Sequence, residues 1–317
     1  MSISLQQGFI ASLNVINFSM KRKIALIGPS TLMVSLPSKW AKKFNLKKGD
    51  EIEVTESDKS LVISTENDFS KKELEINVSS LDTMLYRLVG AVYKSGYEQV
   101  KIVFNTPNQL ETIYDVLRKT CIGFEIIEQS KSYLIIKEIS KPEHHEFENV
   151  LRRNFLFLLS VAKDSLESAK KQEFQELKNI TLRDHNINKY SDFCRRILNK
   201  RNVYEFSKNA PLYCVIEQLE KIGDIYRDLC LHIFENEIKL DKSTLEIFEK
   251  VNGFLSDFYD LFYKFSFENL ETFGTKRKDI KLLLDKRIEK DHHIRYLLNN
   301  IFSTTFDLNG ALITYKL

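Results

Sequence analysis

Apolar residues in the second half of this chain recur with the period of an α-helix. Between residues 143 and 317 they return every three or four positions, and Pro211 is the only proline. This pattern predicts long helices near residues 143–177, 180–200, 209–238, 241–271 and 277–316, the last with a break near 290. Short polar connections between them are typical of a helical bundle, here with two similar halves around 143–238 and 241–317.

Residues 73–139 follow a different pattern, in which strand-like and helix-like segments alternate. Ser79 or Ser80 is the expected cap of the first helix. The order predicts a small βαβαββ sandwich. Its strands are expected at 74–78, 99–104, 124–127 and 133–136, and its helices at 79–94 and 107–120.

The pattern in residues 20–66 predicts short strands before and after one short helix at 38–44. In this helix Trp40 and Phe44 form an i, i+4 pair. Gly28-Pro29 closes the first strand. A unit of this size can hardly bury a core alone, so it needs a partner, most simply a second copy of itself.

The patterns together predict an α+β multidomain protein. We expect an N-terminal tail at 1–19, a β-rich hairpin domain at 20–66, a small α/β domain at 73–140 and a helical bundle at 143–317. The tail lacks the basic residues of a signal peptide. Either Met20 is the natural start or residues 1–19 form a loose tail.

Positive charge is concentrated near the N-terminus. No Asp or Glu precedes Asp50, whereas the remainder of the chain carries 39 basic and 44 acidic residues. The basic residues before Asp50 are Lys21, Arg22, Lys23, Lys39, Lys42, Lys43, Lys47 and Lys48. The net charge of +3 hides this asymmetry.

A local basic surface on an otherwise balanced protein is typical of a polyanion binder. Lys39, Lys42 and Lys43 stand at helical spacing and project from one face. The six candidate DNA-binding residues are Lys21, Arg22, Lys23, Lys39, Lys42 and Lys43. The alternative is a solvated surface that keeps a small domain in solution, although such surfaces normally mix both signs of charge.

An acidic stripe marks the segment expected to form a helix at 209–238. Glu220, Asp224 and Asp228 stand at i, i+4 and i+8, so they line one side of that helix. Carboxylates in bundles can hold a divalent metal or iron, which makes these three residues candidate metal ligands. The alternative is a polar stripe partly neutralised by Lys221 and Arg227.

Other chemistry finds little support in the sequence. It contains no P-loop, no G-x-S-x-G and no H-E-x-x-H motif, so we do not expect an enzyme. No apolar run is long enough to cross a membrane. Four scattered cysteines without a C-x-x-C pair favour reduced thiols and a cytoplasmic location.

The segment from Arg22 to Val54 resembles the AbrB/SpoVT swapped-hairpin domain. The resemblance rests on a strand ending in Leu36-Pro37, a short basic helix, and Leu46-x-x-Gly-Asp-x-Ile-x-Val54. It implies an interlaced homodimer that binds double-stranded DNA through basic residues near the first strand and the helix. Some members act as antitoxins with a disordered tail, whereas a folded body follows here.

The helical part resembles PhoU, the phosphate-uptake regulator built from two three-helix repeats. The similarity lies in Ile180-x-x-x-Asp184-x-x-Ile187 and in Leu219-Glu220-Lys-Ile-Gly-Asp224. It implies a metal cluster, but the second repeat keeps only Asp307, with Ser303 where a glutamate would fall. The combination of parts is similar to phosphate-uptake regulators of archaea.

The resemblances imply a dimeric, cytoplasmic, DNA-binding transcriptional regulator linked to phosphate uptake, with a helical bundle that senses or docks a partner. The alternative is an adaptor that controls a phosphate transporter or kinase without binding DNA, in which the hairpins only dimerise.

Overall fold

The computed structural model describes residues 20–57, 60–64, 73–140, 144–200, 206–285 and 292–317. Contacts within the chain divide it into an N-terminal unit, Met1–Ser70, and a C-terminal unit, Lys71–Leu317. The tail predicted at 1–19 and the helix break predicted near 290 lie outside the described residues. The α/β segment and the helical segment, which we expected as separate domains, belong to one compact unit.

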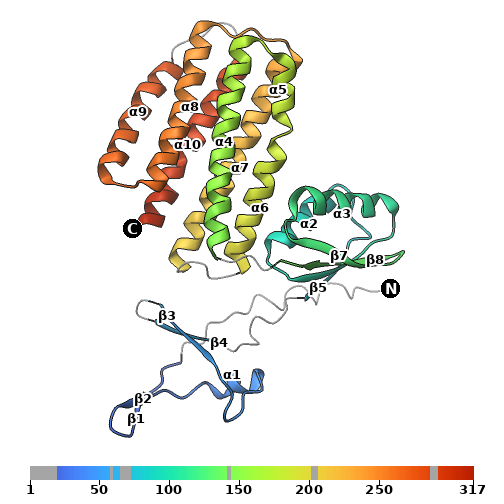
Figure 1. The fold of residues 1–317 in the computed structure, drawn as a ribbon, viewed down its shortest axis with the longest axis vertical. Helices are drawn as coiled ribbons and strands as arrows, with labels where there is room; N and C mark the ends of the chain where they lie inside the picture. Colours follow the sequence, from blue (N-terminus) through green and yellow to red (C-terminus); the bar gives the residue numbers. More distant parts are fainter. Residues whose placement is uncertain (1–19, 58–59, 65–72, 141–143, 201–205, 286–291) are drawn as a thin grey trace, which may run out of the picture. The chain divides into compact units, whose positions relative to one another are not determined.

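The described part of the N-terminal unit contains two hairpins and one short helix (Figure 1). Strands β1 (Ala25–Ile27) and β2 (Thr31–Met33) pair antiparallel, with Leu26 opposite Leu32. Gly28, at φ 68°, begins the turn between them, a conformation that glycine adopts without strain. After helix α1 (Ser38–Lys43), strands β3 (Glu53–Ser57) and β4 (Ser60–Ser64) form the second antiparallel pair.

The α/β segment has the predicted βαβαββ order. Its elements are β5 (Glu73–Asn77), α2 (Leu85–Lys94), β6 (Gln99–Val103), α3 (Pro107–Thr120), β7 (Phe124–Gln129) and β8 (Tyr133–Glu138). The strands lie in the order β5-β6-β8-β7, and only β5 and β6 run parallel. Side chains that include Val100, Ile102 and Leu134 form a core with helices α2 and α3.

The first helix of this segment starts later than predicted. It begins at Leu85, and its preceding residue, Met84, provides no side-chain cap, so the caps expected at Ser79 or Ser80 are wrong. Asn77 accepts a hydrogen bond from the Ser79 N–H instead, which holds this stretch in a turn.

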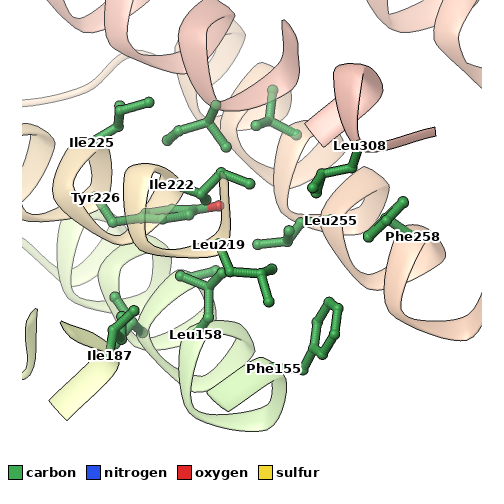
Figure 2. Packing of buried hydrophobic residues seen from close by; sticks show 14 of the residues in the cluster. Phe155, Leu158, Ile187, Leu219, Ile222, Ile225, Tyr226, Leu255, Phe258 and Leu308 are labelled. Atoms are coloured by element: carbon green, nitrogen blue, oxygen red, sulfur yellow. The ribbon is translucent and has the colours of Figure 1, made fainter. Parts of the chain in front are cut away.

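The helical segment contains seven helices within the described residues. They are α4 (His144–Lys171), α5 (Phe174–Thr181), α6 (Asp184–Lys200), α7 (Phe206–Glu235), α8 (Lys242–Tyr263), α9 (Phe267–Asp285) and α10 (His292–Lys316). Helix α7 packs against α4, α5, α6 and α10, which makes it the central helix of the bundle (Figure 1). Apolar side chains from α4, α6, α7, α8 and α10 meet in a single core (Figure 2).

Two predicted helices are interrupted in the structure. The segment expected at 143–177 breaks at Gln172, whose φ of 58° cannot continue a right-handed helix. The segment expected at 241–271 breaks after Tyr263, since Lys264 has a non-helical backbone with φ −123° and ψ 53°. Helix α9 then begins after Ser266, whose hydroxyl accepts a hydrogen bond from the Asn269 N–H. Helical periodicity continues across both breaks, so the pattern alone did not show them.

Helix α6 joins the α/β segment to the bundle through Arg196, which is 1% exposed. Its guanidinium donates to the carbonyl oxygen of Tyr93 at the end of α2, at 2.7 Å, and to that of Tyr97 in the loop that follows, at 2.8 Å. It also pairs with the Glu138 carboxylate at 3.3 Å and lies over the Phe124 ring. A cation at the carbonyl end of a helix is favourable, because the helix dipole is negative there.

Replacing Arg196 should therefore weaken the C-terminal unit. In Arg196→Met, the buried Glu138 carboxylate and two carbonyl oxygens lose a donor, and we expect the free energy of unfolding to fall by about 3 kcal/mol. Urea denaturation would measure this loss. Arg153→Met, at an exposed position on α4, is the control and should change little. Equal stability of the two variants would contradict the role of Arg196 in joining the α/β segment to the bundle.

Helix α7 packs tightly against α6 at Gly223, which is buried. A Cβ atom built there would lie 2.9 Å from Ile187 Cδ1 and 3.1 Å from Ile187 Cγ2. Ile187 is itself fully buried, so it has little room to move.

We expect Gly223→Ala to lower the free energy of unfolding by about 1–2 kcal/mol, because overpacking outweighs the gain in helix propensity. The control is Gly253→Ala on α8, where no atom lies within 4 Å of the new Cβ. That variant should be neutral or slightly stabilised. Thermal unfolding measures both, and a stabilised Gly223→Ala would show that the helices separate easily.

Candidate nucleic-acid interface

Helix α1 carries Lys39, Lys42 and Lys43, and it begins directly after Pro37. Pro37 precedes the helix with φ −62° and ψ 123°, and its carbonyl accepts a hydrogen bond from the Ala41 N–H. Trp40 and Phe44 form the predicted pair, with ring centroids 5.4 Å apart, and Lys43 lies over the Phe44 ring. The helix carries no acidic residue in its first turn, so nothing on it offsets the lysines.

All six predicted DNA-binding residues are exposed. Lys21, Arg22 and Lys23 lie in the segment before β1, whereas Lys39, Lys42 and Lys43 lie on α1. Lys47 and Lys48, in the turn that follows, are exposed as well. Within the described part of the chain, no carboxylate forms an ion pair with any of the eight cations. These charges are therefore available to an external polyanion.

The same unit also exposes much of its apolar surface. Nine large apolar side chains are between 47% and 67% exposed. They are Met20, Ile24, Leu26, Ile27, Leu32, Met33, Val34, Val54 and Leu61. No residue of this unit whose burial is described is buried, and neither apolar core includes one. The described residues of one copy thus form no core of their own.

The three predicted metal ligands lie on α7, and each forms an ion pair with an arginine. Glu220 pairs with Arg195 of α6. Asp224 and Asp228 pair with Arg227 at 2.6 and 2.9 Å. The described residues contain no group of three or more His, Cys, Asp or Glu that could hold a metal ion. The structure thus offers no support for the predicted metal site.

Of the two cations expected to neutralise the stripe, Arg227 takes part and Lys221 is exposed without a described ion pair. Arg195 was missed, because its contacts with α7 cross between helices. The only local signal was Asp192, three residues before it, whose carboxylate lies 2.7 Å from the Arg195 guanidinium. Burial raises the pKa of Asp184, the other partner of Arg227, although Arg227 itself acts in the opposite direction.

No helix among the described residues is both long enough and apolar enough to cross a membrane.

Comparison with known proteins gives one match. Residues 26–71 match the family described as antidote-toxin recognition MazE, bacterial antitoxin. Searches of the curated proteins and of the solved structures found no match to this chain. The likeness of the helical segment to PhoU and the archaeal origin therefore stay predictions. The family match supports the swapped-hairpin class predicted for the N-terminal unit, so this part of the chain is similar to a DNA-binding or antitoxin-type regulator domain.

Proposed function

We propose that this protein is a DNA-binding transcriptional regulator that acts as a homodimer through its N-terminal unit. The observation that carries the proposal is a group of exposed cations, without ion pairs among the described residues, on a unit whose described residues form no core and which matches the MazE family over residues 26–71. The C-terminal unit senses or docks a partner linked to phosphate uptake.

Burial of apolar surface favours the dimer. Fully burying a large apolar side chain contributes about 1.5–3 kcal/mol, and nine such side chains stand exposed in one copy. An isolated two-stranded hairpin is at best marginally stable in water, and this unit has two. A second copy would cover these side chains and give the unit the core that it lacks.

Pairing would also bring two sets of cations onto one surface. Duplex DNA attracts such a surface because each neutralised phosphate releases a condensed counterion. Phosphate contacts fix position but do not read bases, so the six cations account for affinity and not for the choice of operator.

The C-terminal unit supplies regulation in this proposal. Its α/β segment and bundle are joined by Arg196, so a partner or effector bound to either would act on one body. A change in this unit would alter the spacing of the two basic surfaces and hence DNA affinity, by linkage. Four free cysteines suit a reducing cytoplasm, and we assign no catalytic role to the chain.

We also consider a second function, because the exposed apolar surface would drive dimerisation whether or not DNA binds. The protein would then be an adaptor that regulates a phosphate transporter or kinase through its C-terminal unit. DNA binding by the full chain distinguishes the two functions, and genome-wide DNA occupancy at high and low phosphate would test the link to phosphate uptake.

Removal of the α1 lysines should weaken DNA binding. For the full chain, the logarithm of the binding constant should fall linearly with the logarithm of salt concentration. In a Lys39/Lys42/Lys43→Ala variant, the slope should become shallower by about one for each lysine that contacts a phosphate. Fluorescence anisotropy with labelled duplex DNA measures the slope, and Trp40, the only tryptophan, gives a second signal from α1.

The matched control is Lys239/Lys250/Lys278→Ala, which removes three exposed lysines from the C-terminal unit and changes the net charge equally. It should bind DNA as the unmodified chain does. A salt slope near zero for the unmodified chain would exclude phosphate contacts and favour the adaptor.

A charge placed in the exposed apolar surface should prevent dimerisation. Leu32 is 67% exposed on β2, and Leu32→Glu would leave a carboxylate in the proposed dimer core. Light scattering should give twice 37.2 kDa for the unmodified chain and 37.2 kDa for the variant. Leu182→Glu, at a position 66% exposed in the C-terminal unit, should remain dimeric. A monomeric unmodified chain would refute the homodimer.

A further inference from the structure

Helices α6 and α7 are joined by two arginines that reach across in opposite directions. Arg195 extends from α6 to α7, where its guanidinium pairs with Glu217 and Glu220. Arg227 extends from α7 to α6, where it lies 2.9 Å from Asp184. Gly223 lies between the two contacts along α7, where a Cβ atom would collide with Ile187 of α6.

The Arg195 contact is the more deeply buried of the two. The Arg195 side chain is 3% exposed and the Asp192 side chain is 8% exposed. Asp192 also pairs with Lys94, the last residue of α2, at 3.2 Å. One continuous series of ion pairs thus runs from α2 through α6 to α7. Two basic and three acidic side chains take part, so the charges in this series nearly cancel.

The Arg227 contact binds three carboxylates at once. Its Nη1 atom lies 2.6 Å from the Asp224 carboxylate and 2.9 Å from that of Asp184, and its Nη2 atom lies 2.9 Å from that of Asp228. A planar guanidinium with five N–H donors suits this task, because it can bind carboxylates on both sides of a seam without losing its proton.

Each carboxylate of the stripe gives one oxygen to an arginine, Glu220 to Arg195 and both Asp224 and Asp228 to Arg227. A divalent cation at the remaining oxygens would lie beside a guanidinium, whose positive charge repels it at this short range. These carboxylates therefore do not fit a metal site, because Arg195 and Arg227 already supply the positive charge that a metal ion would bring.

We infer that Arg195 and Arg227, and not a metal ion, neutralise the acidic stripe and hold α6 against α7. Four residues of the segment Leu219–Asp224 take part in this packing. Glu220 and Asp224 bind the two arginines, Ile222 enters the core, and Gly223 permits the close approach. The bundle should accordingly be stable without metal, and its resistance to heat should depend on the arginines.

Metal content and melting of the full chain test the inference. The purified protein should contain well under one equivalent of metal by mass spectrometry. Its Tm should be the same with excess EDTA, with Mn²⁺ and with Fe²⁺ under anaerobic conditions. One bound metal per chain, or a Tm that falls on chelation, would overturn the inference.

Variants test the arginine directly. Arg227→Met should lower the Tm by roughly 2–6 °C, because three carboxylates lose their counterion. Arg183→Met is a matched control, since Arg183 pairs with Asp164 and Glu176 at 32% exposure and does not join α6 to α7. Its Tm should fall by less. An equal or smaller loss in Arg227→Met would refute the proposed role of Arg227.

A double-mutant comparison remains informative if Arg227→Met is too unstable for a simple interpretation. Asp184→Asn combined with Arg227→Gln should melt close to the Arg227→Gln single variant, because either change alone removes the ion pair between the two residues. Asp184→Asn combined with Arg183→Met should show additive losses. Additive losses in the first pair would contradict direct coupling between α6 and α7 through Arg227.

Discussion

Burial of apolar surface is the constraint on which the rest of this structure depends. The C-terminal unit satisfies it within one chain, with one core in the α/β segment and another in the bundle. The described residues of the N-terminal unit do not satisfy it, because their apolar side chains stay in contact with water. In the homodimer proposed above, burial of these side chains would have to offset the repulsion between two like-charged copies, which a bound polyanion would relieve.

Arg195 and Arg196 are adjacent on α6, and they join this helix to two different parts of the C-terminal unit. Neighbouring residues on a helix point about 100° apart, so Arg195 and Arg196 face different partners. Arg195 binds α7, whereas Arg196 binds the end of α2 and Glu138 of β8. Helix α6 thus holds the bundle on one side and the α/β segment on the other. For this reason two segments with separate cores behave as a single compact unit.

Local features of the sequence were predictable and long-range ones were not. Helix α3 was predicted at its observed bounds, because Pro107 and the Thr106–Gln109 capping box mark its start locally. The exposed cations were predictable because a charge excess needs no tertiary contact. The breaks at Gln172 and Ser266 and the partners of Arg195 depend on backbone conformation or on a neighbouring helix, which periodicity does not describe.

The acidic stripe shows why a motif on one helix cannot identify its own ligand. Carboxylates at i, i+4 and i+8 suit a metal ion and a guanidinium equally, because both bind the same oxygen atoms. The neighbouring helix decides between them, by offering either further carboxylates or an arginine. In this chain α6 brings Arg195 to the stripe, and its Asp184 gives Arg227 of α7 a partner across the seam. The sequence of α7 shows where the carboxylates lie along the helix, and only the packing of α6 against α7 shows which cation they bind.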